Sequence, residues 1–245
     1  DWQQVEIVLP LNPQKTDKIV IGGLLVGKGK MWLDDLKITI DGKELSDPKM
    51  TLFQKEVFAA DQDTEFDKGS GITMVSVEEN QLENLKVLGL TWGFLKYYHP
   101  AVGKGKYNWD YELFRFLPGY LNVKNRTERD ELLLGWTRKY GEIPVCKTCE
   151  PAKGENKLKP DLAWMDNPDL SNDLKKQLRL IYDNRNQDEN YYIAFHPGVG
   201  NPDFTHENKY ADMPFPDAGF RLLSVYKYWN MIAYFFPNRH LTDKD

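Results

Sequence analysis

The chain has 245 residues with 41% hydrophobic and 28% charged side chains, proportions typical of a soluble globular protein with one large or two small domains. Its formal net charge is −5 and it holds no basic run, which removes the electrostatic case for nucleic-acid binding. No apolar stretch is long enough to span a bilayer, so we expect no transmembrane segment. Because the chain begins at Asp1 and not at Met, we expect a processed or trimmed product, whose missing leader says nothing about its compartment.

Residues 1–66 are predicted to be a β-rich, sandwich-like segment. Apolar and polar residues alternate at 5–9 and again at 31–40, and residues 19–26 form a short run of branched apolar side chains. The second alternation ends at Asp41-Gly42, a strong turn signal between two strands.

A polar stretch that contains glycine and serine follows, and we place an inter-domain linker at residues 67–77. Ser76 and Glu79 fit the capping box that opens many helices. Apolar residues then recur every three or four positions, and the helix must end near His99 because Pro100 disfavours helix in the residue before it. The sequence therefore predicts a first helix that is buried on most sides.

Residues 78–245 are predicted to form an aromatic-rich helical domain. After the first helix, apolar spacing indicates four more, at 108–117, 127–140, 171–184 and 217–236. Pro118-Gly119 should stop the first of these four, and Thr127 and Ser171 should cap the next two. One set of polar side chains is expected on a solvated face, namely Arg126, Glu128, Arg129 and Glu131.

The last predicted helix resembles the first. Residues 92–100 read WGFLKYYHP and residues 229–237 read WNMIAYFFP, with Trp, aromatic residues and Pro at matching places. We expect these two helices to have equivalent roles in the core and to pack against each other, without a true sequence duplication. Between them, residues 191–195 are predicted as a lone strand and residues 196–216 as an ordered but irregular loop. The fold class is therefore α+β: a β-sandwich-like segment, complete or incomplete, followed by a mainly helical domain.

Both cysteines, Cys146 and Cys149, lie in one CKTC motif. A local disulfide or a free dithiol is favoured, because the flanking prolines indicate a loop and a thioredoxin-like role needs a helix start. Half of a zinc site comes last, since a structural zinc needs about four ligands and no second pair exists.

No assembled catalytic or metal site is expected. Gly69-Ser70-Gly71 lacks the spacing of a nucleophile elbow. His196, Asp203, His206 and Glu207 could be drawn as a metal cluster, but a proline-rich loop does not supply ligand geometry, and loop hydrogen bonding is favoured. We therefore assign no catalytic, cofactor-binding or metal-binding residue.

The remaining polar candidates are given structural roles. His99 should lie at a helix end, where an imidazolium suits the dipole, and His240 carries no assignment. Asp34-Asp35 is favoured as a hydrogen-bonded sandwich edge over a calcium or sugar contact. Asp161 and Trp164 lie in irregular segments, which carry function more often than their length suggests, yet no carboxylate pair has the spacing of a general acid and base.

Several motifs, most of them aromatic, cover about residues 80–245. In chain order they are WGFLKYYHP (92–100), GKGKYNWDYELFRFLP (103–118), CKTC (146–149), LKPDLAWM (158–165), NYYIAFHPGVGNPDF (190–204), RLLSVYKYWNMIAYFFP (221–237) and LTDKD (241–245). Together they resemble the region upstream of the catalytic domain in bacterial tail-specific (C-terminal-processing) serine peptidases. More loosely, GLLVGKGKMWLDDLKITIDG (23–42) resembles the closing strands of a carbohydrate-binding jelly roll.

The resemblance implies a non-catalytic accessory region that packs on or gates a downstream catalytic domain with a serine nucleophile and a lysine base. No position here matches that serine or lysine, so this chain alone should not cut peptides. The resemblance also implies a secreted, periplasmic or outer-membrane-anchored protein. A carbohydrate- or peptide-binding module that uses exposed aromatic residues is the alternative.

Overall fold

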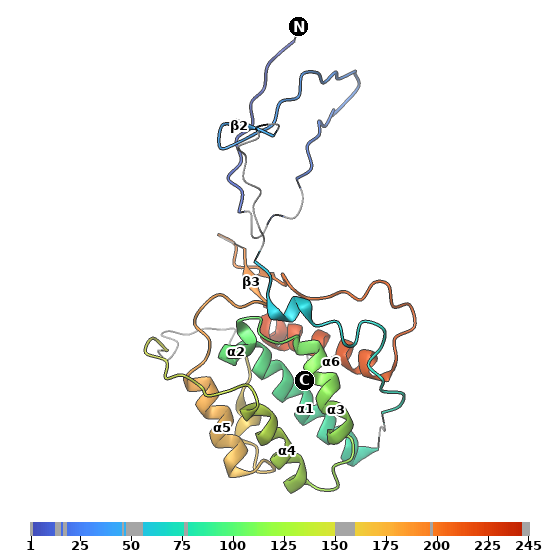
Figure 1. Cartoon of the computed structure of the whole chain (residues 1–245), viewed down its shortest axis with the longest axis vertical. Helices are drawn as coiled ribbons and strands as arrows, with labels where there is room; N and C mark the ends of the chain where they lie inside the picture. Colours follow the sequence, from blue (N-terminus) through green and yellow to red (C-terminus); the bar gives the residue numbers. More distant parts are fainter. Residues whose placement is uncertain are drawn as a thin grey trace. The chain divides into compact units, whose positions relative to one another are not determined.

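The computed structural model describes residues 2–12, 16, 19–45, 47, 56–75, 78–149, 160–196 and 198–241. The chain divides into two compact units, Asp1–Val57 and Phe58–Asp245, which Figure 1 shows. No helix in the described part of the chain is long and apolar enough to cross a membrane.

The first unit contains one small β-hairpin. Strand β1 (Thr39–Ile40) pairs antiparallel with β2 (Lys43–Glu44), with Thr39 opposite Glu44. Asp41 and Gly42 connect the strands with φ angles of 50° and 77°. Two positive φ angles are what a tight two-residue hairpin turn requires, and an Asp-Gly pair meets this need at low cost. The turn predicted at Asp41-Gly42 is therefore confirmed.

The predicted β-sandwich is wrong. Within the described residues of the first unit, β1 and β2 are the only strands, and the apolar side chains that should have faced a core are exposed: Val5 is 75% and Leu24 86% accessible. A strand buries its apolar face only against a second layer, and a two-residue hairpin provides none. Alternation of apolar and polar residues reports a half-buried strand only where that layer exists.

The prediction that Asp34-Asp35 forms a sandwich edge is also wrong, because the described residues of the first unit form no sandwich. Both residues are exposed and lie outside any strand, and the Asp35 amide donates to Oδ1 of Asp34 over 2.8 Å. Asp35 adopts a φ of 52°, a left-handed conformation that Asp tolerates better than most residues because its short side chain bonds locally.

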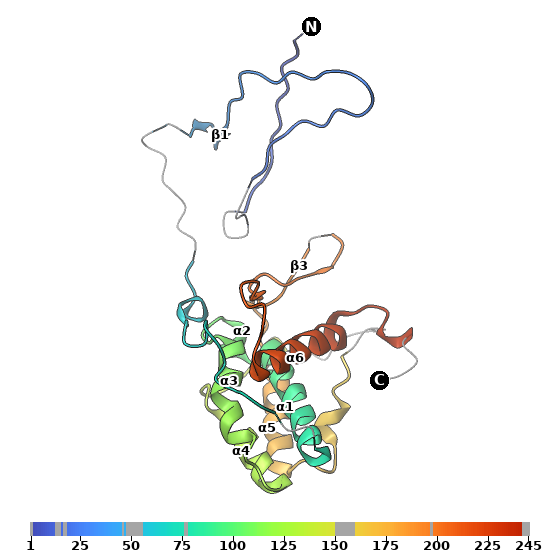
Figure 2. The same cartoon turned by 90° about the vertical axis from the view of Figure 1, so that its right-hand side faces the viewer.

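The second unit is helical. Its helices, visible in Figures 1 and 2, are α1 (Glu79–Tyr98), α2 (Pro100–Gly103), α3 (Trp109–Tyr120), α4 (Arg126–Arg138), α5 (Asn172–Asp183) and α6 (Ala218–Phe235). Three short 3₁₀ turns accompany them: η1 (Ala59–Gln62), η2 (Ala163–Asp166) and η3 (Arg239–Leu241). The predicted lone strand is paired instead: β3 (Ala194–Phe195) lies antiparallel to β4 (Pro202–Asp203), which comes from the segment predicted as an irregular loop.

Helix ends follow the sequence signals in part. Ser171 caps α5 as predicted, and its hydroxyl accepts from the Leu174 amide. Asn125, not Thr127, caps α4, because the Asn125 side chain reaches the Glu128 amide over 2.9 Å. Helix α3 continues past Pro118 to Tyr120, so the predicted stop at Pro118 is wrong. A proline in the last turn lacks an N–H group, but this costs only one of the final hydrogen bonds of the helix. Ser76 lies outside the described residues.

The solvated face predicted on α4 is partly wrong. Arg129 is buried, and its guanidinium donates to Oδ1 of Asp130 and to the Asp169 carbonyl. Oδ2 of Asp130 in turn accepts from the Ser171 amide. The buried Arg129–Asp130 pair thus joins the side of α4 to the start of α5. Its charged groups are hydrogen-bonded to each other and to the backbone there, and not to water.

The predicted packing of the two similar aromatic helices is confirmed, because α1 contacts α6 directly. Figures 1 and 2 show α6 crossing α1 instead of running alongside it. Gly89 and Gly93 lie at the crossing, where Tyr226 and Asn230 of α6 would meet any added Cβ atom. The amide of the Asn230 side chain donates to the Gly89 carbonyl over 3.2 Å. Packing of these two α6 side chains against the backbone of α1 therefore depends on glycine here.

Residues 58–75 belong to the helical unit. Ser70 is buried, its hydroxyl donates to Oδ1 of Asp217 over 2.6 Å, and its amide donates to Oδ2. Asp217 is the N-cap of α6, so this segment is fixed to the start of that helix. Residues 67–75, which we expected within the linker, thus make specific contacts with α6.

Candidate functional site

A cleft of about 430 Å³ opens in the helical unit. Its lining comes from three segments that are distant in the sequence: residues 60–67, residues 108–111 and residues 191–210. Five carboxylates line it: Asp61, Asp63, Asp67, Asp110 and Glu207. Four tyrosines line it as well: Tyr111, Tyr191, Tyr192 and Tyr210. The cleft is therefore acidic and rich in phenol hydroxyls.

Local hydrogen bonds explain how these segments come together. The Ala60 amide of η1 donates to the Gly105 carbonyl over 3.0 Å, and the Tyr191 amide donates to the Gly103 carbonyl over 2.7 Å. The hydroxyl of Tyr192 accepts from the Trp109 amide and donates to the Tyr107 carbonyl. The loop after α2 thus fixes both walls of the cleft.

The first turn of α3 provides the floor. Asn108 caps this helix, its side-chain oxygen accepting from the Tyr111 amide over 3.2 Å. Asp110 follows in the first turn, where the positive end of the helix dipole favours a carboxylate. Its side chain is only 6% exposed.

Two lysines, one of them fully buried, neutralise the floor of the cleft. Nζ of Lys227, from α6, lies 2.7 Å from Oδ2 of Asp110 and 2.8 Å from Oε2 of Glu207. Lys96, from α1, is fully buried, forms an ion pair with Glu207 and lies 3.9 Å from Oδ1 of Asp110. The Lys96 ammonium also lies over the rings of Trp92 and Tyr192, which adds a cation–π attraction.

Burial and charge pairing compete in this cluster. Burial opposes ionisation of Asp110, but Lys227 and Lys96 outweigh it, and the pKa of that carboxyl is lowered. Burial likewise opposes the charge of Lys227, yet Asp110 and Glu207 raise its pKa. For Lys96 burial dominates over its carboxylate neighbours, so its pKa is lowered. Asp110 and Lys227 are thus an ionised pair whose side chains are only 6% and 12% exposed.

Three of the four cleft tyrosines donate their hydroxyls to carboxylates. Tyr111 donates to Oδ1 of Asp67 over 2.5 Å, Tyr191 donates to Asp61, and Tyr210 donates to Oδ2 of Asp110 over 2.7 Å. Burial first and these carboxylates second raise the pKa of Tyr111 and of Tyr191. The phenols are therefore neutral hydrogen-bond donors.

The structure separates the residues that the sequence suggested as a metal cluster. His206 and Glu207 line the cleft, whereas His196 is exposed and Asp203 lies in β4. Nδ1 of His206 lies 2.5 Å from the Tyr191 carbonyl, and its ring stacks on Tyr191 at 3.9 Å between centroids. Within the described residues, no three His, Cys, Asp or Glu side chains are arranged to hold a metal ion.

The other sequence candidates have local roles. His99 does end α1, as predicted, but it is buried and burial lowers its pKa to about 4, so the predicted imidazolium is wrong. Its Nδ1 accepts from the Ala101 amide and caps α2.

Asp161 and Trp164 also have local roles. Asp161 accepts from the Ala163 amide at η2, and Trp164 packs edge-on against Phe94. The side chain of His240 lies outside the described residues.

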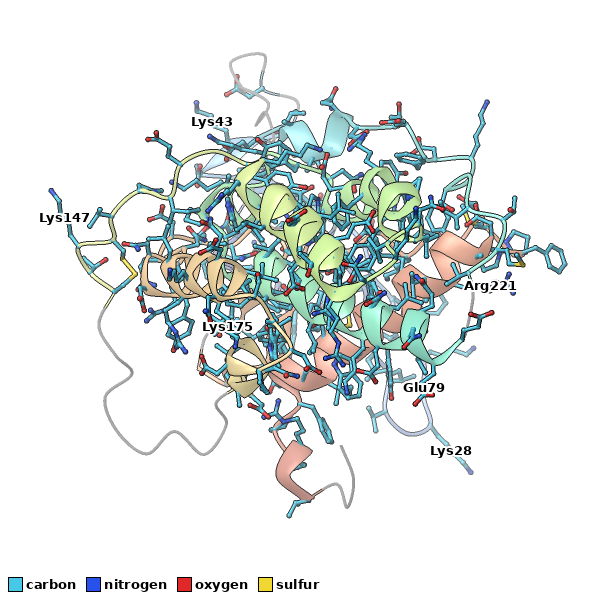
Figure 3. The ribbon with its side chains drawn as sticks, turned by 90° about the horizontal axis from the view of Figure 1, so that it is seen from below. Lys28, Lys43, Glu79, Lys147, Lys175 and Arg221 are labelled. Atoms are coloured by element: carbon cyan, nitrogen blue, oxygen red, sulfur yellow. A yellow bond between two sulfur atoms is a disulfide. The ribbon has the colours of Figure 1, made fainter. Side chains whose placement is uncertain are left out.

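Cys146 and Cys149 form a disulfide, one of the two alternatives that the sequence favoured over a redox role and a zinc site. Figure 3 shows this bond beside Lys147, whose side chain points away from the protein. The Cys146 amide donates to Oδ1 of Asn184 over 2.8 Å, which holds the loop near the end of α5.

Most of this site is not apparent from the sequence. The sequence indicates Glu207 and His206 only as candidate metal ligands, and it gives no signal for Asp61, Asp67 or Asp110. One signal was present: Lys96 lies within the apolar WGFLKYY stretch of a helix predicted to be buried on most sides. A lysine buried there needs a carboxylate partner, which the sequence could not identify.

Comparison with known proteins finds no match: no protein-family model, no curated protein and no solved structure is similar to this chain.

Proposed function

We propose that this chain is a non-catalytic accessory region of a secreted tail-specific serine peptidase, and that its helical unit packs on or gates the catalytic domain. The proposal rests on the ordered aromatic motifs described above and on one structural observation. Helix α6 exposes an apolar stripe of Val225, Tyr228 and Trp229, which are 60%, 71% and 49% accessible. Their spacing of three and four residues places them on one face.

An exposed aromatic stripe of this kind is typical of a protein–protein contact. Trp and Tyr are enriched at interfaces because they bury large areas at little conformational cost. The opposite face of α6 buries Phe220, Leu223 and Tyr226 against the rest of the unit. The helix can therefore join the helical unit to a second domain, and we take that domain to be the peptidase.

The proposed location in the cell envelope or outside the cell agrees with the Cys146–Cys149 bond. Disulfides persist in the periplasm and in secreted proteins, and they are rare in the reducing cytosol. Thiol titration of the native protein should accordingly find no free cysteine.

The reading frame tests the proposal first. We expect a domain with a serine and a lysine at peptidase spacing to be encoded beyond Asp245, and a stop codon shortly after that point would contradict the assignment. Purified on its own, the present chain should show no turnover of a tail peptide, and robust turnover would contradict a non-catalytic role.

The α6 stripe can be tested in the full product of that reading frame. Tyr228→Ser/Trp229→Ser should lower kcat/KM for a tail peptide by about tenfold or more, because loss of two interface aromatics is worth at least 1.4 kcal/mol. Leu180→Ser, at an exposed apolar position on α5, is the matched control and should leave activity unchanged. Equal kcat/KM for both variants would contradict docking through α6.

The alternative function, recognition of a glycan or peptide through exposed aromatics, also has one observation in its favour. Trp2 and Trp32 of the first unit are largely exposed, as is Tyr228 of the second. Titration of the chain with oligosaccharides while tryptophan fluorescence is monitored tests this alternative, and an unchanged spectrum at millimolar ligand would remove the glycan branch.

A further inference from the structure

The Cys146–Cys149 disulfide lies where another molecule can reach it. Both cysteines are half-buried, whereas Lys147 and Thr148 between them are exposed, and Val145 before them is 81% accessible. Figure 3 shows the bond at the outer edge of the helical unit, beside α5. Because thiol–disulfide exchange requires direct access to a sulfur atom, this position is suited to attack by an external thiol.

The bond contributes little to the stability of the fold. It closes a ring that contains only two other residues, so it restricts the unfolded chain much less than a disulfide between distant residues does. The Cys146 amide donates to Oδ1 of Asn184 over 2.8 Å, and this hydrogen bond does not require the disulfide. Reduction of the bond should therefore leave the helical unit folded.

The partners of the two sulfur atoms favour the reduced state. Sγ of Cys149 lies 3.4 Å from the Arg185 carbonyl oxygen. A disulfide sulfur has no proton to donate, but a Cys149 thiol at this position donates its S–H to that oxygen. Sγ of Cys146 lies 3.8 Å from the Thr148 hydroxyl, which donates to a thiolate, and Lys147 supplies a cation one residue away. A disulfide whose reduced form is stabilised in this way is a stronger oxidant.

The same partners give the two cysteines different roles. The hydroxyl and the cation beside Cys146 stabilise a thiolate, whereas the carbonyl beside Cys149 stabilises a protonated thiol. In a thioredoxin-like motif the start of a helix stabilises the thiolate, and here Lys147 and Thr148 do so from within a loop.

We propose that the Cys146–Cys149 disulfide is a redox-active site that accepts two electrons from a dithiol. A thiolate of the dithiol bonds to Sγ of Cys149, the Cys146–Cys149 bond breaks, and Cys146 leaves as a thiolate. The second thiolate of the dithiol then attacks its own sulfur in the mixed disulfide, and Cys149 leaves and takes up a proton. The dithiol is thereby oxidised to a disulfide, and its other proton passes to solvent or, at lower pH, to Cys146.

Equilibration of the whole chain with glutathione tests the proposal, which does not depend on the peptidase assignment. In about 10 mM reduced and about 0.1 mM oxidised glutathione at neutral pH, a structural disulfide stays oxidised. We expect at least about half of the chains to carry two free thiols in this buffer, measured by acid quenching, alkylation and mass spectrometry. A smaller reduced fraction at equilibrium, reached from both the oxidised and the reduced chain, would overturn the proposal.

Two reductants at equal dithiol concentration identify the source of the electrons. Faster reduction of the chain by reduced thioredoxin than by dithiothreitol points to a dithiol protein as the partner. An equal or slower rate with thioredoxin points to a small dithiol, and both results support an exchange site.

Variants and alkylation rates locate the chemistry. Lys147→Glu should slow reduction by dithiothreitol about threefold or more at low salt, because a carboxylate repels both the attacking and the departing thiolate. Lys86→Glu makes the same charge change at an exposed position of α1 and should leave the rate unchanged. In the reduced chain, iodoacetamide should modify Cys146 about fivefold faster than Cys149. Equal reduction rates of the two variants, or modification of Cys149 as fast as that of Cys146, would contradict the proposal.

Discussion

The indole groups of Trp92 and Trp109 bond each other's backbone. Nε1 of Trp92 donates to the Trp109 carbonyl over 3.1 Å, and Nε1 of Trp109 donates to the Trp92 carbonyl over 2.9 Å. Both residues are fully buried, one in α1 and one at the start of α3. The exchange satisfies both indoles without water and fixes the position of α3, whose first turn carries Asp110 to the cleft.

Replacing Trp109 by Phe should therefore destabilise the helical unit by about 2–4 kcal/mol. The change leaves the buried Trp92 carbonyl without this donor, which costs about 1–3 kcal/mol, and it leaves a void beside Trp136, which stacks on Trp109 at 5.1 Å. Urea unfolding followed by circular dichroism measures the loss. Trp229→Phe, at an exposed position of α6, should change stability by less than about 0.5 kcal/mol, and comparable losses for both variants would contradict this account.

Gly93→Ala should destabilise the crossing of α1 and α6. A Cβ atom at Gly93 would lie 1.8 Å from Oδ1 of Asn230, and overpacking of this kind costs about 1–3 kcal/mol. Gly135→Ala is the matched control, because a Cβ atom there has open space within helix α4, and it should stabilise by about 0.4–1 kcal/mol. Both are measured by thermal unfolding, and a neutral Gly93→Ala would contradict this account, because it would show that the Asn230 side chain moves aside without cost.

The ion pair of Lys96 and Glu207 should matter more than any pair on the surface. Lys96→Met leaves a carboxylate buried with one cation fewer, which costs about 3–5 kcal/mol, whereas Lys96→Met/Glu207→Met should lose less than the single variant. Lys176→Met removes an exposed pair with Asp173 and should cost at most about 1 kcal/mol. A urea series over these variants checks the order, and a double variant that is less stable than Lys96→Met would contradict it.

His99 should make the helical unit sensitive to acid. Burial lowers its pKa from 6.5 to about 4, so between these values the unfolded chain binds a proton that the folded chain does not. The contribution of neutral His99 to the unfolding free energy is therefore fully present above pH 6.5. It is lost as the pH falls towards 4, and the total loss is about 3 kcal/mol. His99→Asn keeps an acceptor for the Ala101 amide but does not titrate, so its unfolding free energy should fall less over this range. Parallel slopes for both proteins would exclude His99 as the cause.

Loss of the disulfide should have a small effect. The Cys146–Cys149 bond closes a loop that contains only two other residues, and the restriction of the unfolded chain by so short a loop is worth roughly 2 kcal/mol or less. Cys146→Ser/Cys149→Ser should lower the unfolding free energy by that amount without changing the helical circular dichroism spectrum. Unfolding of the helices on reduction would show that the loop holds more of the unit than its contacts with Asn184 and Arg185 indicate.

Local signals in the sequence determined much of the secondary structure of this protein. The spacing of apolar residues specified the long helices, Ser171 and Asp41-Gly42 specified a cap and a turn, and matching aromatic patterns indicated that α1 and α6 pack together. Each of these features depends on neighbours within a turn or two of the chain, or on side chains that are apolar on one face, and both are visible in sequence.

Only the tertiary structure decided which polar residues meet. Lys96 is 111 residues from Glu207, and Asp110 is 117 residues from Lys227, and no local rule selects such partners. The alternation in residues 1–66 was misleading for the same physical reason, because a strand is stable only when a second layer covers its apolar face. The acidic cleft exists because three distant segments bring their carboxylates to one place, and buried lysines below it offset the repulsion.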